Sequence, residues 1–127
     1  MTRSYPTSIP AAYADYADAY RTGWNQGHGI ACHNVPKLGV TLWIDAFGRV
    51  TVDADNIREV HEAACFEAEE RARSYSPWRQ MGYEFRATDL EEAATLWEAY
   101  EAGVADAIAA DIATYTDDDY GITAEEA

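Results

Sequence analysis

The chain has 127 residues, of which 48% are hydrophobic and 13% aromatic, and its formal net charge is −14 at pH 7. The length predicts a single domain over residues 1–127, and the apolar content is too high for a disordered acidic chain. The charge excludes direct binding to nucleic acid or to an anionic membrane, because both surfaces are negative. No apolar run approaches the ~20 residues of a membrane span, and no secretory signal is visible. We therefore expect a cytoplasmic protein.

The negative charge is concentrated in the last third of the chain. Residues 1–86 hold 11 acidic and nine basic side chains, whereas residues 87–127 hold 12 acidic side chains and no basic one. Adaptation to salt would spread acidic residues over the whole surface. The observed concentration instead indicates a partner with a basic surface, and the largest basic surfaces in a cell belong to proteins that hold DNA or RNA.

The first half of the chain predicts a helix followed by a β-hairpin. Residues 8–10 are a favourable helix start, and residues 27–29 contain two glycines that favour a helix end. Residues 40–44 alternate in polarity as a strand does, and the next five residues predict a turn with Gly48 at a positive φ. Residues 50–52 are then the expected return strand.

The second half predicts a helix, a strand and a long last helix. The helix begins near residues 53–55 and runs to about Arg73, with apolar positions at helical spacing. Residues 82–87 alternate as a third strand. A capping box at residues 88–91 begins a helix that runs to about Tyr115.

The order helix, β-hairpin, helix, strand, helix predicts an α+β domain with a three-stranded, mainly antiparallel sheet and helices packed on it. After the last helix, residues 116–127 are expected to form a frayed acidic tail. A short pentad, Ala-Tyr-x-x-Gly, occurs at residues 19–23 and again at residues 99–103. We interpret the two copies as a helix-packing pattern rather than as an internal repeat.

The last helix carries a row of carboxylates that can act as a binding face. Seven acidic residues between Asp89 and Asp111 span ~33 Å of helix, or one charge per ~5 Å, against one phosphate per ~3.4 Å along a DNA strand. The helix is therefore a thin imitation of one strand, and a solvated face with a solubilising tail is the alternative. The expected partner-binding residues are Glu91, Glu92, Glu98, Glu101, Asp106 and Asp111, supported by Asp117, Asp118 and Asp119.

Two stretches, residues 76–78 and residues 97–103, are similar to stretches in phage proteins. With its short acidic chain, α+β pattern and aromatic edges, the protein resembles the phage and mobile-element inhibitors of host defence, the antirestriction and anti-CRISPR proteins. That resemblance implies an inhibitor that occupies the nucleic-acid groove of a defence complex. It supplies no catalytic residues.

All histidines and cysteines lie in two clusters, His28-x3-Cys32-His33 and His61-x3-Cys65. In a chain without a leader, cysteines are expected as thiols or metal ligands. A spacing of four places a histidine and a cysteine on one face of a helix, where both can bind one metal ion. The candidate zinc ligands are His28 or His33 together with Cys32, His61 and Cys65. The alternative is that His61 and Cys65 belong to the core.

Cys32 is also a candidate nucleophile, with His28 or His33 as its base. Such a pair needs a third group that orients the base, and Asn34 is available in the sequence. Because no catalytic fingerprint accompanies the pair, we expect a protein that is not an enzyme.

Two rival functions remain open beside the acidic binding protein. One is a phage structural or assembly protein that associates through a helix face made of Tyr13, Tyr16, Tyr20 and Trp24. The other is a zinc-stabilised adaptor. Monomer and homodimer are both compatible with the sequence, and no cofactor other than zinc is indicated.

Overall fold

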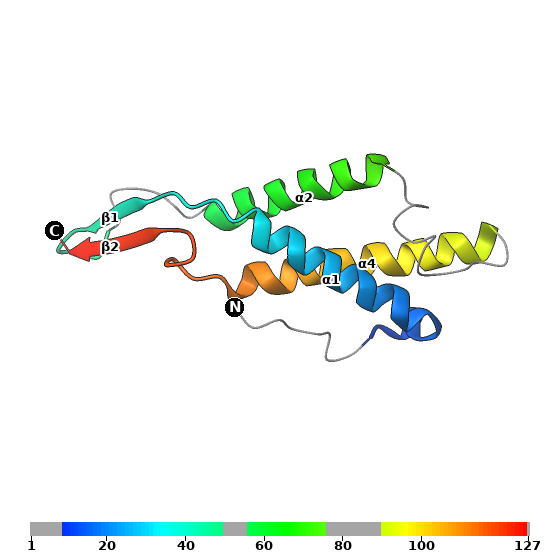
Figure 1. Cartoon of the computed structure of the whole chain (residues 1–127). Coiled ribbons are helices and arrows are strands. Elements are labelled where there is room, and N and C mark those ends of the chain that lie inside the picture. The colour runs from blue at the N-terminus through cyan, green and yellow to red at the C-terminus, as the bar shows by residue number, and fades with distance from the viewer. Residues whose placement is uncertain (1–8, 50–55, 76–89, 127) are drawn as a thin grey trace.

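The computed structural model describes residues 9–49, 56–75 and 90–126. The elements in chain order are the 3-10 helix η1 (Ala11–Tyr16), α1 (Ala17–His33), β1 (Val40–Ile44), α2 (Ile57–Tyr75), α4 (Leu90–Thr114) and β2 (Ile122–Glu126). The three α-helices of the described part pack together, and the two strands form a narrow ribbon that extends from one end of them (Figure 1). α1 and α4 run in the same direction, whereas α2 runs in the opposite direction.

Glycines allow α1 and α4 to approach closely where they cross. A Cβ atom added to Gly23 would overlap the carbonyl oxygen of Tyr100, and one added to Gly103 would overlap that of Tyr20. These four residues belong to the two Ala-Tyr-x-x-Gly pentads, so the glycine of each pentad packs against the tyrosine of the other. Glycine is the one residue that permits such an approach of two backbones. The contact supports the interpretation of the pentads as a packing pattern.

The main core lies between α1, α4 and the inner face of α2. Its buried members are Ala19, Ile30, Ala31, Cys65, Leu96, Ala99, Tyr100, Val104, Ile108 and Ile112. Tyr20 and Trp24 are buried in a neighbouring cluster with Ala107. The hydroxyl of Tyr20 donates a hydrogen bond of 2.5 Å to Asp106. Because Tyr20 and Trp24 pack inside the protein, they are not part of an exposed face for self-association.

α2 caps the C-terminal ends of both other helices. Nε2 of His61 donates a hydrogen bond of 2.9 Å to the carbonyl of Ala31 in the last turn of α1. The guanidinium of Arg58 donates to the carbonyls of Ile112 and Tyr115 at the end of α4. The last four carbonyls of a helix lack partners within the helix, and cationic side chains near them also meet a favourable helix dipole. α2 therefore fixes the ends of the two parallel helices relative to each other.

The predicted three-stranded, mainly antiparallel sheet is wrong. The described residues are mostly helical and contain a two-stranded parallel sheet, in which Val40 of β1 pairs with Ile122 of β2. The turn after β1 is confirmed, because Gly48 has a φ of 76° and its N–H donates to the carbonyl of Asp45. The return strand predicted at residues 50–52 and the third strand at residues 82–87 lie outside the described residues.

The predicted end of the first helix is also wrong, because α1 continues through residues 27–29 to His33. Gly27 packs against α4 instead of ending the helix, and its added Cβ would overlap the carbonyl oxygen of Val104. Packing between helices offsets the low helix propensity of glycine at this position. The extra turn is what places His28 and Cys32 on a helix rather than in a loop.

The C-terminal segment is folded rather than frayed over residues 116–126, the part of it that the structure describes. Tyr120 and Ile122 are buried with Ile57 and Tyr115 in a second small core, against which Leu42 of β1 packs. These apolar side chains lie between acidic ones, and their burial offsets the cost of ordering the segment. The acidic residues at this end therefore occupy defined positions.

Candidate functional site

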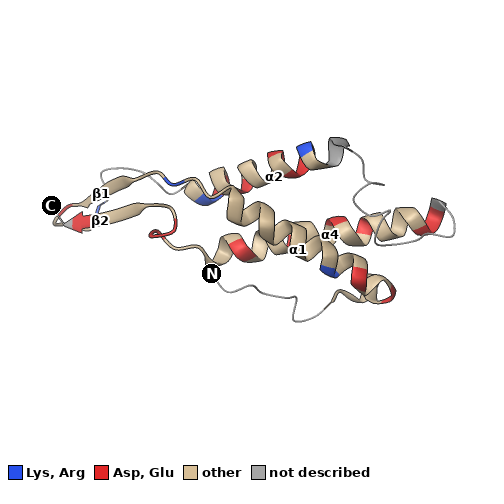
Figure 2. Ribbon diagram, in the orientation of Figure 1, with Lys and Arg blue, Asp and Glu red and all other residues tan. Residues whose placement is uncertain are grey.

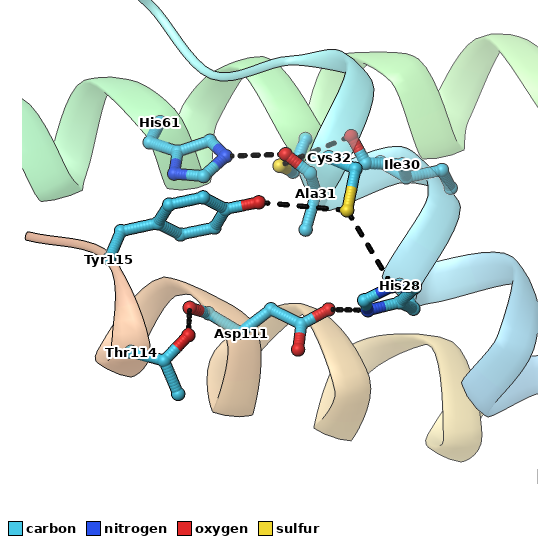
Figure 3. Close-up of polar contacts among 9 residues, drawn as sticks. His28, Ile30, Ala31, Cys32, His61, Asp111, Thr114 and Tyr115 are labelled. Atoms are coloured by element: carbon cyan, nitrogen blue, oxygen red, sulfur yellow. Dashed lines mark hydrogen bonds and ion pairs between the residues drawn. The ribbon is translucent and has the colours of Figure 1, made fainter. Parts of the chain in front are cut away.

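Cys32, His28 and Asp111 form a chain of side-chain contacts near the C-terminal end of α1 (Figure 3). Nδ1 of His28 lies 2.6 Å from Oδ2 of Asp111 on α4, and Nε2 lies 3.6 Å from Sγ of Cys32. A carboxylate only accepts hydrogen bonds, so in the neutral ring Nδ1 carries the proton and Nε2 presents its lone pair to the thiol. Thiol, imidazole and orienting carboxylate is the arrangement in which a histidine activates a nucleophile.

The three side chains differ in exposure in the way that such an arrangement needs. The side chain of Asp111 is 5% exposed, that of His28 is 14% exposed, and Cys32 lies on the surface. His28 and Cys32 are one helical turn apart, so they share a face of α1. The close contact of Gly27 with Val104 brings this face against α4, where Asp111 lies in the last full turn. The carboxylate is thus inside the protein and the thiol is open to solvent.

Tyr115 connects this cluster with the buried His61. The hydroxyl of Tyr115 donates toward Sγ of Cys32 over 3.7 Å, and the tyrosine ring packs edge-on against His61 with ring centroids 5.0 Å apart. The two rings lie next to each other between α2 and the end of α4 in Figure 3. Burial, and then the hydrogen bond to Cys32, raise the pKa of Tyr115 above its ordinary value. The hydroxyl therefore stays protonated and remains a donor to the sulfur.

The second histidine–cysteine pair, His61 and Cys65, is fully buried. Because Nε2 of His61 donates to the carbonyl of Ala31, Nδ1 accepts the hydrogen bond of 3.0 Å from the hydroxyl of Tyr120 in the neutral ring. Burial, followed by nearby negative charges, raises the pKa of Cys65 to about 11. The pair is a satisfied part of the core, as the alternative to the zinc site expected.

The structure does not gather the predicted zinc ligands into one site. Across the residues that the structure describes, no group of three or more His, Cys, Asp or Glu side chains is arranged to hold a metal ion. Both ring nitrogens of His61 contact protein atoms, and Nδ1 of His28 contacts Asp111. The zinc-stabilised adaptor stays a prediction that this geometry does not support.

Most of the predicted partner-binding residues lie on the surface, and Asp111 is the exception. At about 100° per residue, Glu98 lies within about 20° of Glu91 around α4, whereas Asp111 lies about 160° from Glu91. Asp111 is only 4% exposed, so its assignment to the acidic face is wrong. The exposed members of the predicted set are Glu91, Glu98, Asp106, Asp117, Asp118 and Asp119, and the half-buried members are Glu92 and Glu101.

A groove with a volume of about 530 Å³ lies between α2 and α4. Its lining combines alanine and isoleucine side chains of α4, of which the isoleucines are buried, with acidic side chains of α2. Glu59 and Glu62 are exposed and form its rim. Figure 2 shows acidic positions along both helices. Phe66 of α2 also lines the groove and is 61% exposed, so its ring is open to contact with a partner. The groove is lined by Glu59, Glu62, Ala63, Phe66, Glu69, Ala105, Ile108, Ala109 and Ile112.

Two of the predicted partner-binding residues lie on α4 beyond the groove, toward the N-terminus of the helix. Glu98 is seven residues before Ala105, and Glu101 is four residues before it, so all three side chains share one face of the helix. The part of α4 that lines the groove is therefore apolar, and two carboxylates lie outside the groove toward the N-terminus of the same helix face.

In comparisons with known proteins, no family model matches the chain, and no curated protein or solved structure is significantly similar to it. None of the helices in the described residues is long and apolar enough to cross a membrane. The candidate sites therefore rest on the geometry of this chain alone.

Sequence reasoning missed that Asp111 is the carboxylate in position to orient His28, because the two residues are 83 positions apart. It considered Asn34 for that role, and Asn34 instead caps α1 through a hydrogen bond of 2.8 Å to the carbonyl of Ile30. One signal was present in the sequence. The helical spacing already places Asp111 on the opposite side of α4 from Glu91 and Glu98, among the apolar residues.

Proposed function

We propose that this protein binds a basic surface on a protein or complex that handles nucleic acid, and thereby blocks that surface. The observation that carries the proposal is the groove between α2 and α4, which is lined by apolar side chains of both helices and by three carboxylates of α2. The sequence has no basic residue after Arg86, so the whole C-terminal third also favours a basic partner. Complementary charge raises the association rate and selects the partner, while apolar contact supplies affinity.

The groove fits an amphipathic basic segment, such as a helix with Lys or Arg beside a row of apolar residues. The apolar row of that segment would cover Ile108 and Ile112 and pack against the exposed ring of Phe66. Its basic residues would lie beside Glu59 and Glu62 on the rim. Segments of this composition are common where proteins hold DNA or RNA, because they must meet phosphates.

In its sharpest form the proposal is an inhibitor of a restriction or CRISPR complex that acts in the cytoplasm. Residues 87–127 have a net charge of −12, so the protein competes with nucleic acid for a basic surface rather than binding nucleic acid itself. Competition distinguishes this function from assembly into a particle, because a structural protein gains nothing from displacing DNA.

The test measures displacement of labelled DNA from a panel of purified restriction and CRISPR effector complexes. Fluorescence anisotropy of the labelled DNA is followed as the protein is added at low and at moderate salt. We expect displacement from at least one complex, and we expect it to weaken as salt rises. If the protein displaces DNA from no member of the panel at low salt, the proposal is contradicted.

Matched charge reversals then locate the binding surface. Glu59→Lys together with Glu62→Lys reverses two exposed carboxylates on the groove rim, and we expect displacement to be lost. Asp15→Lys together with Asp18→Lys makes the same change in net charge at exposed positions outside the residues that line the groove. Equal loss in both double variants would show that net charge, and not the groove, is responsible.

A further inference from the structure

We propose that Cys32 is a nucleophilic thiol that reacts with low-molecular-weight disulfides, with His28 as its base and Asp111 as the residue that positions the base. The proposal is independent of partner binding, because none of these three residues lines the α2–α4 groove. It rests on the contacts of 3.6 Å between Sγ and Nε2 and of 2.6 Å between Nδ1 and Asp111.

The geometry assigns each atom a role in the exchange. Nε2 of His28 accepts the proton of the Cys32 thiol, and the proton on Nδ1 remains in its hydrogen bond to Asp111. The thiolate sulfur attacks one sulfur of the small disulfide, so a new S–S bond forms while the original S–S bond breaks. The departing thiolate takes the proton from Nε2 and leaves as a thiol. The exchange needs no oxidant other than the disulfide itself.

The surroundings of the sulfur favour this chemistry over a passive surface thiol. The imidazolium formed on proton transfer is stabilised by Asp111, whose carboxylate is almost fully buried. The hydroxyl of Tyr115 donates toward the sulfur over 3.7 Å and stabilises negative charge on it. The sulfur itself is exposed, so a small disulfide reaches it without any opening of the protein.

The product is a mixed disulfide that persists. Resolution to an internal disulfide needs a second thiol, and Cys65 is the one other cysteine of the chain. Cys65 is 0% exposed and its pKa is raised to about 11, so at neutral pH it is neither accessible nor ionised. Cys32 is therefore a site of S-thiolation rather than one half of a redox-active pair.

The test follows the rate of reaction with 4,4′-dithiodipyridine, a neutral disulfide that the net charge of −14 does not repel. Stopped-flow absorbance gives the rate in the full chain, and mass spectrometry after digestion assigns it to a cysteine. At pH 7 we expect Cys32 in the folded protein to react about 10-fold faster than the same cysteine in urea, because unfolding removes His28 and Asp111 from the thiol. Equal rates in the two states would overturn the proposal.

Three variants separate activation from structure. His28→Gln and Asp111→Asn are each expected to slow Cys32 by about 10-fold, while His33→Gln, at the exposed histidine next to Cys32, leaves its rate unchanged. Cys65 serves as an internal control, since its labelling rises only if a variant opens the fold.

Positioning by Asp111 has a further signature. Between pH 6 and 9, the pH dependence of the Cys32 reaction rate in Asp111→Asn should resemble that in His28→Gln. Tyr115 and the neighbouring His33 are titratable groups that both variants retain. A variant in which Cys65 is labelled faster than in wild type has lost its fold. For such a variant, the comparison of folded with urea-treated wild type serves as the test instead. A slower Cys32 in His33→Gln, or an unchanged Cys32 in both His28→Gln and Asp111→Asn, contradicts the assignment.

Discussion

Two histidine–cysteine pairs with the same spacing lie on two helices of this protein and have opposite surroundings. On α1, His28 contacts the buried carboxylate of Asp111, and Cys32 is exposed. On α2, His61 and Cys65 are both fully buried, and His61 contacts uncharged groups. The identical i, i+4 spacing places each pair on one helix face and does nothing further. What each pair can do is decided by the helix that faces it.

The facing groups explain the difference between the pairs. When a histidine takes a proton from a neighbouring thiol, a carboxylate in contact with its ring stabilises the positive charge that forms. A histidine held between a carbonyl and a hydroxyl has both ring nitrogens occupied, and it connects α1 with the segment that follows α4. The pair on α1 is therefore suited to chemistry, and the pair on α2 is suited to stability.

The largest effect is expected at the buried pair. His61→Ala leaves a cavity and removes the partners of the Ala31 carbonyl and the Tyr120 hydroxyl. We expect the free energy of unfolding, measured by urea denaturation, to fall by about 3–5 kcal/mol. His33→Ala, the same substitution at an exposed histidine, should change it by less than about 0.5 kcal/mol. A loss below about 1 kcal/mol in His61→Ala would show that the pair on α2 is not structural.

The next largest effect is expected from a substitution that disturbs the pair on α1 without changing His28 or Cys32. Gly27→Ala places a Cβ against the backbone of Val104 and 2.9 Å from the Cβ of Ala107, so α1 must move away from α4. We expect a loss of about 3 kcal/mol in urea denaturation and a slower reaction of Cys32, because His28 is drawn away from Asp111. This outcome would show that the close crossing of the two helices builds the exposed pair.

Gly29 provides the matched control on the same helix. A Cβ added to Gly29 meets no atom within 4 Å. Gly29→Ala should therefore raise the free energy of unfolding by up to about 1 kcal/mol through helix propensity alone. If both glycine variants have the same effect, helix propensity rather than the contact with α4 dominates.

These two glycines also show why the fold was only partly predictable. Helix periodicity and capping patterns located α2 and α4 to within a few residues, because those signals are local. At residues 27–29 the same local rules predicted a helix end, and a contact with a helix some 80 positions later overrode them. The parallel pairing of β1 with β2 is likewise a long-range contact, so the hydrophobic alternation of β1 identified a strand but not its partner.

The candidate site divides in the same way. The helical spacing of His28 and Cys32 was readable, and so was the option that His61 and Cys65 belong to the core. The role of Asp111 was not, because a carboxylate in an acidic helix was counted with its exposed neighbours. Its position opposite those neighbours on the helical wheel was the one local indication that it faces inward.

A smaller effect sharpens the contrast between the two thiols through pH. Cys65 has a pKa of about 11 in the fold against an ordinary value of 9.0, so between these pH values the folded protein keeps a proton that the unfolded chain loses. The stability it contributes is fully present below pH 9 and is lost as pH rises toward 11, at up to about 1.4 kcal/mol per pH unit. Cys65→Ala removes this contribution. The difference in unfolding free energy between wild type and variant should thus become smaller above pH 9. A difference that stays constant with pH would contradict this prediction.

The smallest effect is expected at Tyr115, which touches both pairs. Tyr115→Phe keeps the ring against His61 and removes the hydroxyl that donates toward Cys32. Because the packing on the buried pair is unchanged, we expect the unfolding free energy to change by about 1 kcal/mol or less. The reaction of Cys32 with dithiodipyridine should slow a few-fold, since the sulfur loses a donor that stabilises its negative charge. A large loss of stability with an unchanged thiol rate would mean that the hydroxyl serves the core rather than the exposed pair. In that case Tyr115, which contacts both pairs, would act on stability alone, and the contrast between a reactive pair and a structural pair would not hold at this residue.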